Sequence, residues 1–120
     1  LTKNMSDTQE RTGFISVKPL SVNDSYRGRR FKTGEYHVYE QILTLKLKPR
    51  NVPEGKLELD VIFCTSNKLS DVDNFLKPFI DILQKKYGFN DRDIYKICVT
   101  KEIVKKGEEG MAFEIRAFTQ

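Results

Sequence analysis

One stretch of the chain carries an apolar residue at every second position, and this spacing constrains the whole fold. In KLELDVIFCTS, residues 56–66, every second residue is apolar over Leu57, Leu59, Val61 and Phe63. Successive side chains of a strand point to opposite faces, so this pattern predicts a strand with one buried face. A helical pattern at residues 73–88 follows it. The chain is therefore expected to pack helices against a sheet.

The segment DNFLKPFIDILQKKYG, residues 73–88, is the clearest helix in the sequence. Its apolar residues recur at helical spacing, and its last turn carries two lysines followed by Gly88, a typical helix end. Pro78 conflicts with a helix interior, because proline lacks the N–H group and clashes one turn back. We therefore expect Pro78 in the first turn, or a tight turn over residues 73–77.

The remaining segments complete one α/β domain with a mixed sheet, roughly β-α-β-α-β-β, over residues 14–120. A flexible arm is expected at residues 1–13. Residues 34–47 fit both a helical stripe and a strand alternation, and the helix is favoured. The other expected elements are a strand at 14–20 ended by Pro19, a long loop at 21–34, a strand at 94–104, a hairpin turn at 105–110 and a strand at 111–118.

Composition narrows the classes of function. The 120 residues suit one domain, and no apolar run is long enough to span a membrane, so a cytoplasmic protein is expected. The net charge of +4 includes a basic run, YRGRRFK at residues 26–32, which fits either a solvated loop or contact with a polyanion. Cys64 and Cys98 are expected as reduced core residues, and His37 as a surface residue. This set excludes a His/Cys zinc site.

Carboxylates gather around the predicted strand–helix junction. Asp71 and Asp73 follow the strand at 56–66, and residues two apart in extended chain point the same way. Asp91, in the turn after the helix, is expected to approach them from the other side. Three carboxylates repel one another unless a cation lies among them, and Mg²⁺ prefers such oxygen ligands. Lys77 would share the helix face of Asp73, and Asn74 could steady a carboxylate or a bound water.

A purely structural interpretation explains the same residues without a metal site or a catalytic role. Asp73 alone would make a good N-cap for the helix. Lys77 and Asp81 are spaced as a surface ion pair, and Asn90-Asp91 is ordinary turn chemistry. Spacing alone leaves both interpretations open.

The acidic motif resembles that of a known family. The run Asp71-x-Asp73-Asn74-x-x-Lys77-x-x-x-Asp81-x-Leu83, then Asn90-Asp91-x-x-Ile94 and Lys101, is similar to the RusA family of Holliday-junction resolvases. The stretch Pro19-x-Ser21-Val22-Asn23 and the basic residues after it also resemble that family. The resemblance extends from about Phe14 to Phe118. Two departures are Asn90, where the family often has an acidic residue, and Ser70, where some members have a basic one.

The resemblance implies a small mixed α/β endodeoxyribonuclease that acts as a homodimer on four-way DNA junctions and cuts two opposed strands. It implies Asp71, Asp73 and Asp91 as catalytic metal ligands, Lys77 as the essential basic residue, and Mg²⁺ (or Mn²⁺) as the cofactor. No small-molecule cofactor is expected, and a bacterial, prophage or phage origin is implied. The residues expected to contact DNA are Asn23, Arg27, Arg29, Arg30, Lys32, Lys68 and Lys101.

Two other functions remain open from the sequence. The same site could serve a nuclease selective for flaps or other branched DNA. Alternatively, the chain could bind junctions without cutting them, with its aspartates acting as caps and turns.

Overall fold

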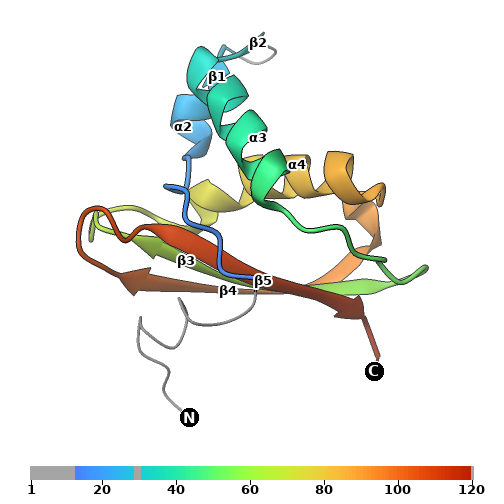
Figure 1. The fold of residues 1–120 in the computed structure, drawn as a ribbon. Helices are drawn as coiled ribbons and strands as arrows, with labels where there is room; N and C mark the ends of the chain where they lie inside the picture. Colours follow the sequence, from blue (N-terminus) through green and yellow to red (C-terminus); the bar gives the residue numbers. More distant parts are fainter. Residues whose placement is uncertain (1–12, 29–30, 120) are drawn as a thin grey trace.

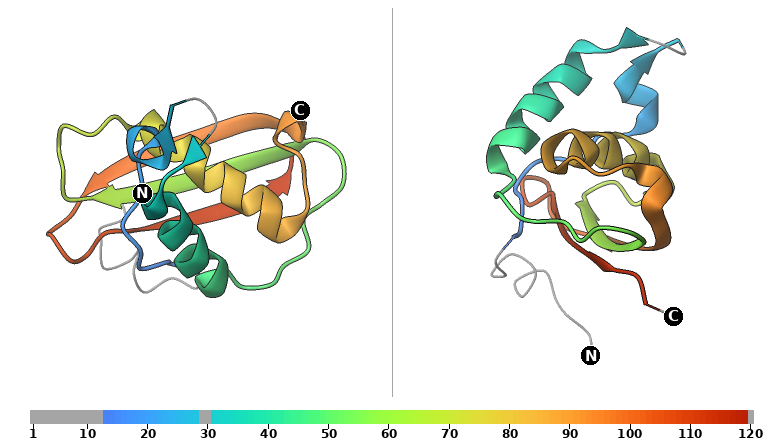
Figure 2. Two further views of the ribbon diagram at one scale, coloured as in Figure 1. Left: turned by 90° about the horizontal axis from the view of Figure 1, so that it is seen from above. Right: turned by 90° about the vertical axis from the view of Figure 1, so that its right-hand side faces the viewer.

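A three-stranded mixed sheet forms the base of the computed structural model, which describes residues 13–28 and 31–119 (Figure 1). Its strands are β3 (Leu57–Thr65), β4 (Ile94–Ile103) and β5 (Gly110–Ala117), in the order β4-β3-β5. β4 runs parallel to β3, and β5 runs antiparallel to it (Figure 2). The predicted single α+β domain with a mixed sheet is confirmed.

Two helices, α3 (Gly34–Lys46) and α4 (Leu76–Tyr87), lie on one face of the sheet (Figure 1). The core lies between these layers. The face of β3 with Leu59, Val61 and Phe63 is buried there, and the Phe63 ring lies 5.5 Å from that of Phe79 on α4. The expected helix at 34–47 and the strand at 56–66 are therefore confirmed.

The start of α4 resolves the difficulty with Pro78. A short 3₁₀ helix, η1 (Val72–Phe75), precedes α4, so Pro78 is the third residue of α4 and lies in its first turn. An N–H group at that position has no partner within the helix in any case. At the other end, Gly88 adopts φ 77° and its N–H donates to the Gln84 carbonyl at 2.8 Å, which ends the helix.

The N-terminal part differs from prediction. The expected strand at 14–20 is wrong, because only Ile15 makes a β-bridge, with Met111. The expected loop at 21–34 contains α2 (Val22–Ser25) and a small hairpin of β1 (Tyr26–Arg27) and β2 (Phe31–Lys32). The expected arm falls largely on residues 1–12, outside the described residues.

The expected hairpin between the last two strands is also wrong. β4 and β5 lie on opposite sides of β3, so residues 104–109 pass across the end of β3. The Val104 N–H donates to the Thr65 carbonyl at 3.0 Å, and Ser66 donates to the Glu109 carboxylate at 2.8 Å. These bonds hold the connection over the strand end.

The cysteines differ from each other. Both are free, but only Cys64 is buried; Cys98 is exposed on β4, so its expected core position is wrong. Burial, together with the nearby Glu102 carboxylate, raises the pKa of the Cys64 thiol to about 12. His37 is exposed, as expected. None of the helices in residues 13–28 and 31–119 is long and apolar enough to cross a membrane.

Candidate functional site

The loop that leads to Asp71 is held by hydrogen bonds from both sides. Within the loop, the Leu69 N–H donates to the Asn67 side chain at 2.9 Å. From β4, the Lys101 ammonium donates to the carbonyls of Lys68 and Ser70, at 3.1 and 2.8 Å. The backbone before Asp71 is therefore tied to the end of β4.

Asp71 and Asp73 are exposed, and their carboxylates make no hydrogen bond or ion pair with any residue that the structure describes. Asp71 precedes η1 and Asp73 is the second residue of η1. The expectation that Asp73 caps the long helix is wrong: Phe75 occupies the cap position of α4, without a side-chain bond. The structural interpretation therefore does not account for these two carboxylates.

Lys77 lies in the first turn of α4, four residues after Asp73. Its ammonium is 3.7 Å from the Asp81 carboxylate, and its side chain is 62% exposed. The expected surface pair is thus present. Asp81 also accepts a hydrogen bond from the Tyr26 hydroxyl at 2.9 Å, which links the β1–β2 hairpin to α4.

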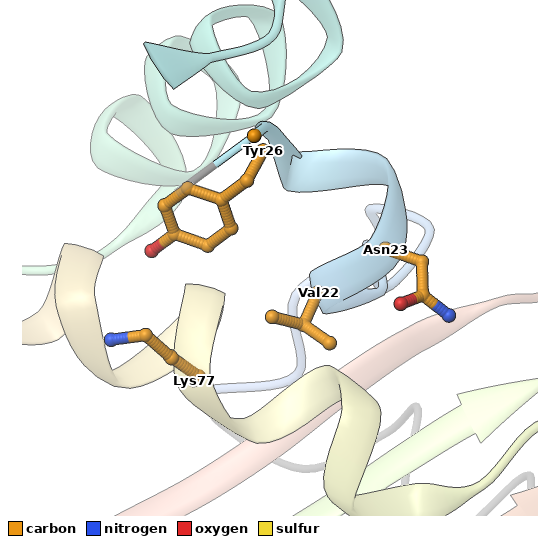
Figure 3. Close-up of a pocket in the computed structure, with 5 residues that line it drawn as sticks. Val22, Asn23, Tyr26 and Lys77 are labelled. Carbon is orange, nitrogen blue, oxygen red and sulfur yellow. The ribbon is translucent and has the colours of Figure 1, made fainter. Parts of the chain in front are cut away.

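An open hollow of about 610 Å³ lies between α2, the hairpin and α4 (Figure 3). In Figure 3 the Tyr26 ring and the Val22 side chain extend into the space above Lys77, whereas the Asn23 amide points away from it. Asn23 and Lys77 were expected from the sequence as site residues, whereas Val22, Tyr26 and Gly28 were not. The one available signal was an aromatic residue, Tyr26, at the start of the basic run. The lining residues are Val22, Asn23, Tyr26, Gly28 and Lys77.

Further tyrosine and lysine side chains lie next to Tyr26, which lines this hollow. Burial, and then the hydrogen bond to Asp81, raises the pKa of Tyr26 to about 12. The Lys32 ammonium lies 3.3 Å from the Tyr36 hydroxyl and 4.4 Å from the centre of that ring. Burial and the nearby Lys85 ammonium lower the pKa of Lys32. Lys32 is therefore held against the Tyr36 ring, which lies beside that of Tyr26.

The other proposed DNA contacts are spread around this region. Arg27 on β1 and Lys68 in the loop before Asp71 are both exposed. Lys101 is exposed too, but its ammonium is engaged by the loop carbonyls described above. Arg29 and Arg30 lie outside the described residues.

Asp91 lies at the opposite end of the sheet from Asp71. It begins the 3₁₀ helix η2 (Asp91–Asp93), just before β4. Because β4 is parallel to β3, its start lies beside the start of β3, whereas Asp71 follows the end of β3. A nine-residue strand such as β3 is roughly 30 Å long. No group of three His, Cys, Asp or Glu residues in the described part of the chain is placed to hold a metal ion.

The expectation that Asp91 joins Asp71 and Asp73 is therefore wrong within one chain. The expected turn chemistry is present, since the Asn90 side chain accepts from the Arg92 N–H at 3.0 Å. The Asp91 N–H donates to the Gln84 side chain at 2.8 Å, and the residue is exposed. Its carboxylate is not part of that turn.

The remaining pair of carboxylates fits the ligand preference of magnesium. Mg²⁺ is commonly held by one or two carboxylates, with waters and substrate phosphate completing its shell. Asp71 and Asp73 supply two exposed carboxylates on a short segment whose entry is fixed by Lys101. Asn74, the next residue, is half-buried.

Comparison of the chain with models of known protein families finds no match, and comparison with curated proteins finds none either.

Proposed function

We propose that this protein is a Mg²⁺-dependent endodeoxyribonuclease that resolves four-way DNA junctions by paired phosphodiester hydrolysis, as a homodimer. One observation carries the proposal. Asp71 and Asp73 are exposed, bind no described residue, and precede the exposed Lys77 by six and four residues. No described residue gives these two carboxylates a partner, whereas metal-assisted hydrolysis needs both kinds of group.

The residues take distinct parts in this proposal. Asp71 and Asp73 hold the metal ion, and Mn²⁺ would suit the same oxygen ligands. When bound, the ion supplies electrostatic stabilisation of the phosphate and acidifies water for attack. Lys77 places a positive charge where negative charge develops on the phosphate oxygens. Its partner Asp81 is also bonded to Tyr26, which keeps the Lys77 side chain beside the hollow.

The surface around the site suits a polyanion. The hollow is lined by Lys77 and by backbone at Gly28, exposed Arg27 precedes Gly28, and exposed Lys68 lies in the loop before Asp71. Phosphate contacts by such residues release counterions, so binding should weaken as salt rises. Selectivity for a junction then comes from shape, with two sites held at a fixed spacing.

Asp91 enters this site from a second copy. Within one chain the parallel strands separate it from Asp71 by the length of the sheet. A homodimer removes this separation if the two chains run in opposite directions at their interface. The homodimer therefore supplies both the paired cuts and the third carboxylate.

Cleavage of a synthetic four-way junction, compared with linear duplex of the same sequence, tests the proposal. With Mg²⁺ we expect symmetric paired nicks in the junction alone, and none with a chelator. Equal cutting of flaps or three-way branches would replace the resolvase by a general branched-DNA nuclease. Junction binding without cutting, with Mg²⁺ or Mn²⁺, would contradict the nuclease altogether.

A further inference from the structure

The outer edge of β4 is an open edge of the sheet. β4 has ten residues and pairs only with β3, so among the described residues no strand covers its other side (Figure 2). Apolar side chains are exposed along it: Tyr95 is 58% exposed, Ile97 42% and Ile103 45%. A long exposed edge with apolar side chains is a template for pairing with another strand.

Lysines on an edge strand often prevent such pairing, so the pattern of charge determines whether β4 can pair with another strand. Lys96 pairs with Glu58 of β3, and Glu102 pairs with Cys64. Both side chains therefore lie on the face of the sheet away from the helices. They are equally distant in sequence from Val99, at three residues on either side. Two copies of this edge that run in opposite directions are therefore complementary in charge.

We propose that β4 pairs antiparallel with β4 of a second copy, about a two-fold axis that is perpendicular to the sheet at Val99. The two three-stranded sheets become one continuous sheet. Lys96 of each copy then lies opposite Glu102 of the other, and Cys98 lies opposite Thr100. Opposite charges at facing positions stabilise a strand pair, and this dimer has two such pairs.

Neighbouring registers lack this match. An axis at Cys98 places Lys96 opposite Thr100 and Glu102 opposite Ile94. An axis at Thr100 places Lys96 opposite Val104 and Glu102 opposite Cys98. Only the axis at Val99 pairs both charges, so the sequence of β4 selects it.

This interface also explains how Asp91 could reach the site of the other copy. That explanation rests on the proposed function. In an antiparallel pair the start of one β4 lies beside the end of the other. Asp91 comes just before β4, and Lys101 near its end holds the loop to Asp71. The pairing therefore brings Asp91 of each copy to the end of the sheet that carries Asp71 and Asp73 of the other.

A single substitution, Thr100→Cys, tests the register by using the native Cys98. Facing residues of an antiparallel pair have Cα atoms within the range that a disulfide can bridge. Under mild oxidation we expect a covalent dimer of Thr100→Cys on a non-reducing gel. The wild type and the control Cys98→Ser/Thr100→Cys should stay monomeric on that gel. A covalent dimer in the control would place the axis at Thr100, one in the wild type would place it at Cys98, and none in any variant would overturn the interface.

A charge exchange tests the same contact without oxidation. Lys96→Glu should raise the dimer dissociation constant roughly tenfold or more, because two attractive pairs become repulsive. Lys96→Glu/Glu102→Lys should restore it, while Lys86→Glu, an exposed control on α4, should leave it unchanged. Mass from sedimentation equilibrium is the readout, with circular dichroism as the check of folding. A monomeric wild type, or a double variant no tighter than Lys96→Glu, would overturn the interface.

These readouts need neither DNA nor metal, so they separate the interface from the nuclease. A crosslinked Thr100→Cys dimer that never cuts a junction would keep the interface and contradict the proposed function. Junction cutting by a protein that fails both interface tests would keep the proposed function and contradict the interface.

Discussion

The hydroxyl of Tyr26 donates a hydrogen bond to the Asp81 carboxylate at 2.9 Å, across 55 residues of sequence. The bond joins the β1–β2 hairpin to α4 and forms one side of the hollow beside Lys77. Asp81 is mostly buried, at 19% side-chain exposure, so its carboxylate depends on this partner and on Lys77. The position of the hairpin over the candidate site therefore depends on this pair.

Tyr26→Phe should lower the free energy of unfolding by about 1–2 kcal/mol, since a hydrogen bond to a charged group is lost. The raised pKa of Tyr26 gives a second signature. A raised folded-state pKa means that the stability is fully present below the unfolded value near 10 and is lost as pH rises towards about 12. Urea unfolding at pH 7 and at pH 11 measures both. An equal alkaline loss in Tyr26→Phe and wild type would contradict the assignment.

Asp71→Asn should keep the fold and junction binding but abolish cutting. Its carboxylate contacts no described residue, so the unfolding free energy should change by less than about 0.5 kcal/mol. Thermal unfolding, junction binding in chelator and cleavage in Mg²⁺ are the three measurements. Glu54→Gln, an exposed residue at the other end of the sheet, is the matched control. Loss of binding together with cutting would indicate a structural role for Asp71.

Lys77→Ala should stop turnover with little loss of stability, because an exposed ion pair contributes at most about 1 kcal/mol. Single-turnover cleavage at saturating protein measures the chemical step apart from binding. Lys86→Ala, an exposed lysine near the end of the same helix, should cut at the wild-type rate. A Lys77→Ala variant that cuts at near the wild-type rate would remove Lys77 from the mechanism.

The sequence predicted the elements whose signals are local. Alternation in β3 and helical spacing in α4 depend only on neighbouring residues, and both were located correctly. Pairing depends on residues far apart, so β4 and β5 were joined as a hairpin although β3 lies between them.

The wrong prediction that Asp91 joins Asp71 within one chain has a different cause. A β-α-β unit with parallel strands already implies that a turn before the second strand lies far from the loop after the first. The chain order therefore contained the reason why Asp91 cannot reach Asp71 in one chain. In contrast, no local pattern indicates the bond between Tyr26 and Asp81, because it joins two segments that meet only in the folded molecule.

Replacing Arg29 and Arg30 together should reduce the salt dependence of junction binding. If each arginine neutralises one phosphate, the slope of log K against log salt should fall by about 1.8. Binding is measured by fluorescence anisotropy in chelator over a range of salt. Lys46, the last residue of α3, and Lys48, just beyond the helix, are the control pair, since they lie outside the hollow. An unchanged slope in the arginine variant would exclude these two arginines from the DNA contact.

Mixing two inactive variants tests whether Asp91 acts across the dimer. In a mixed dimer of Asp71→Asn and Asp91→Asn, a shared site leaves one site with both residues native and one with neither. Remixing the two proteins after reversible dissociation should therefore restore cutting, as single nicks because only one site works. If Asp91 instead served its own chain, every site in the mixed dimer would carry one substitution, and no cutting would return. Each variant alone, treated in the same way, shows whether the treatment itself restores cutting. Products with one nick and products with two paired nicks are separated on denaturing gels.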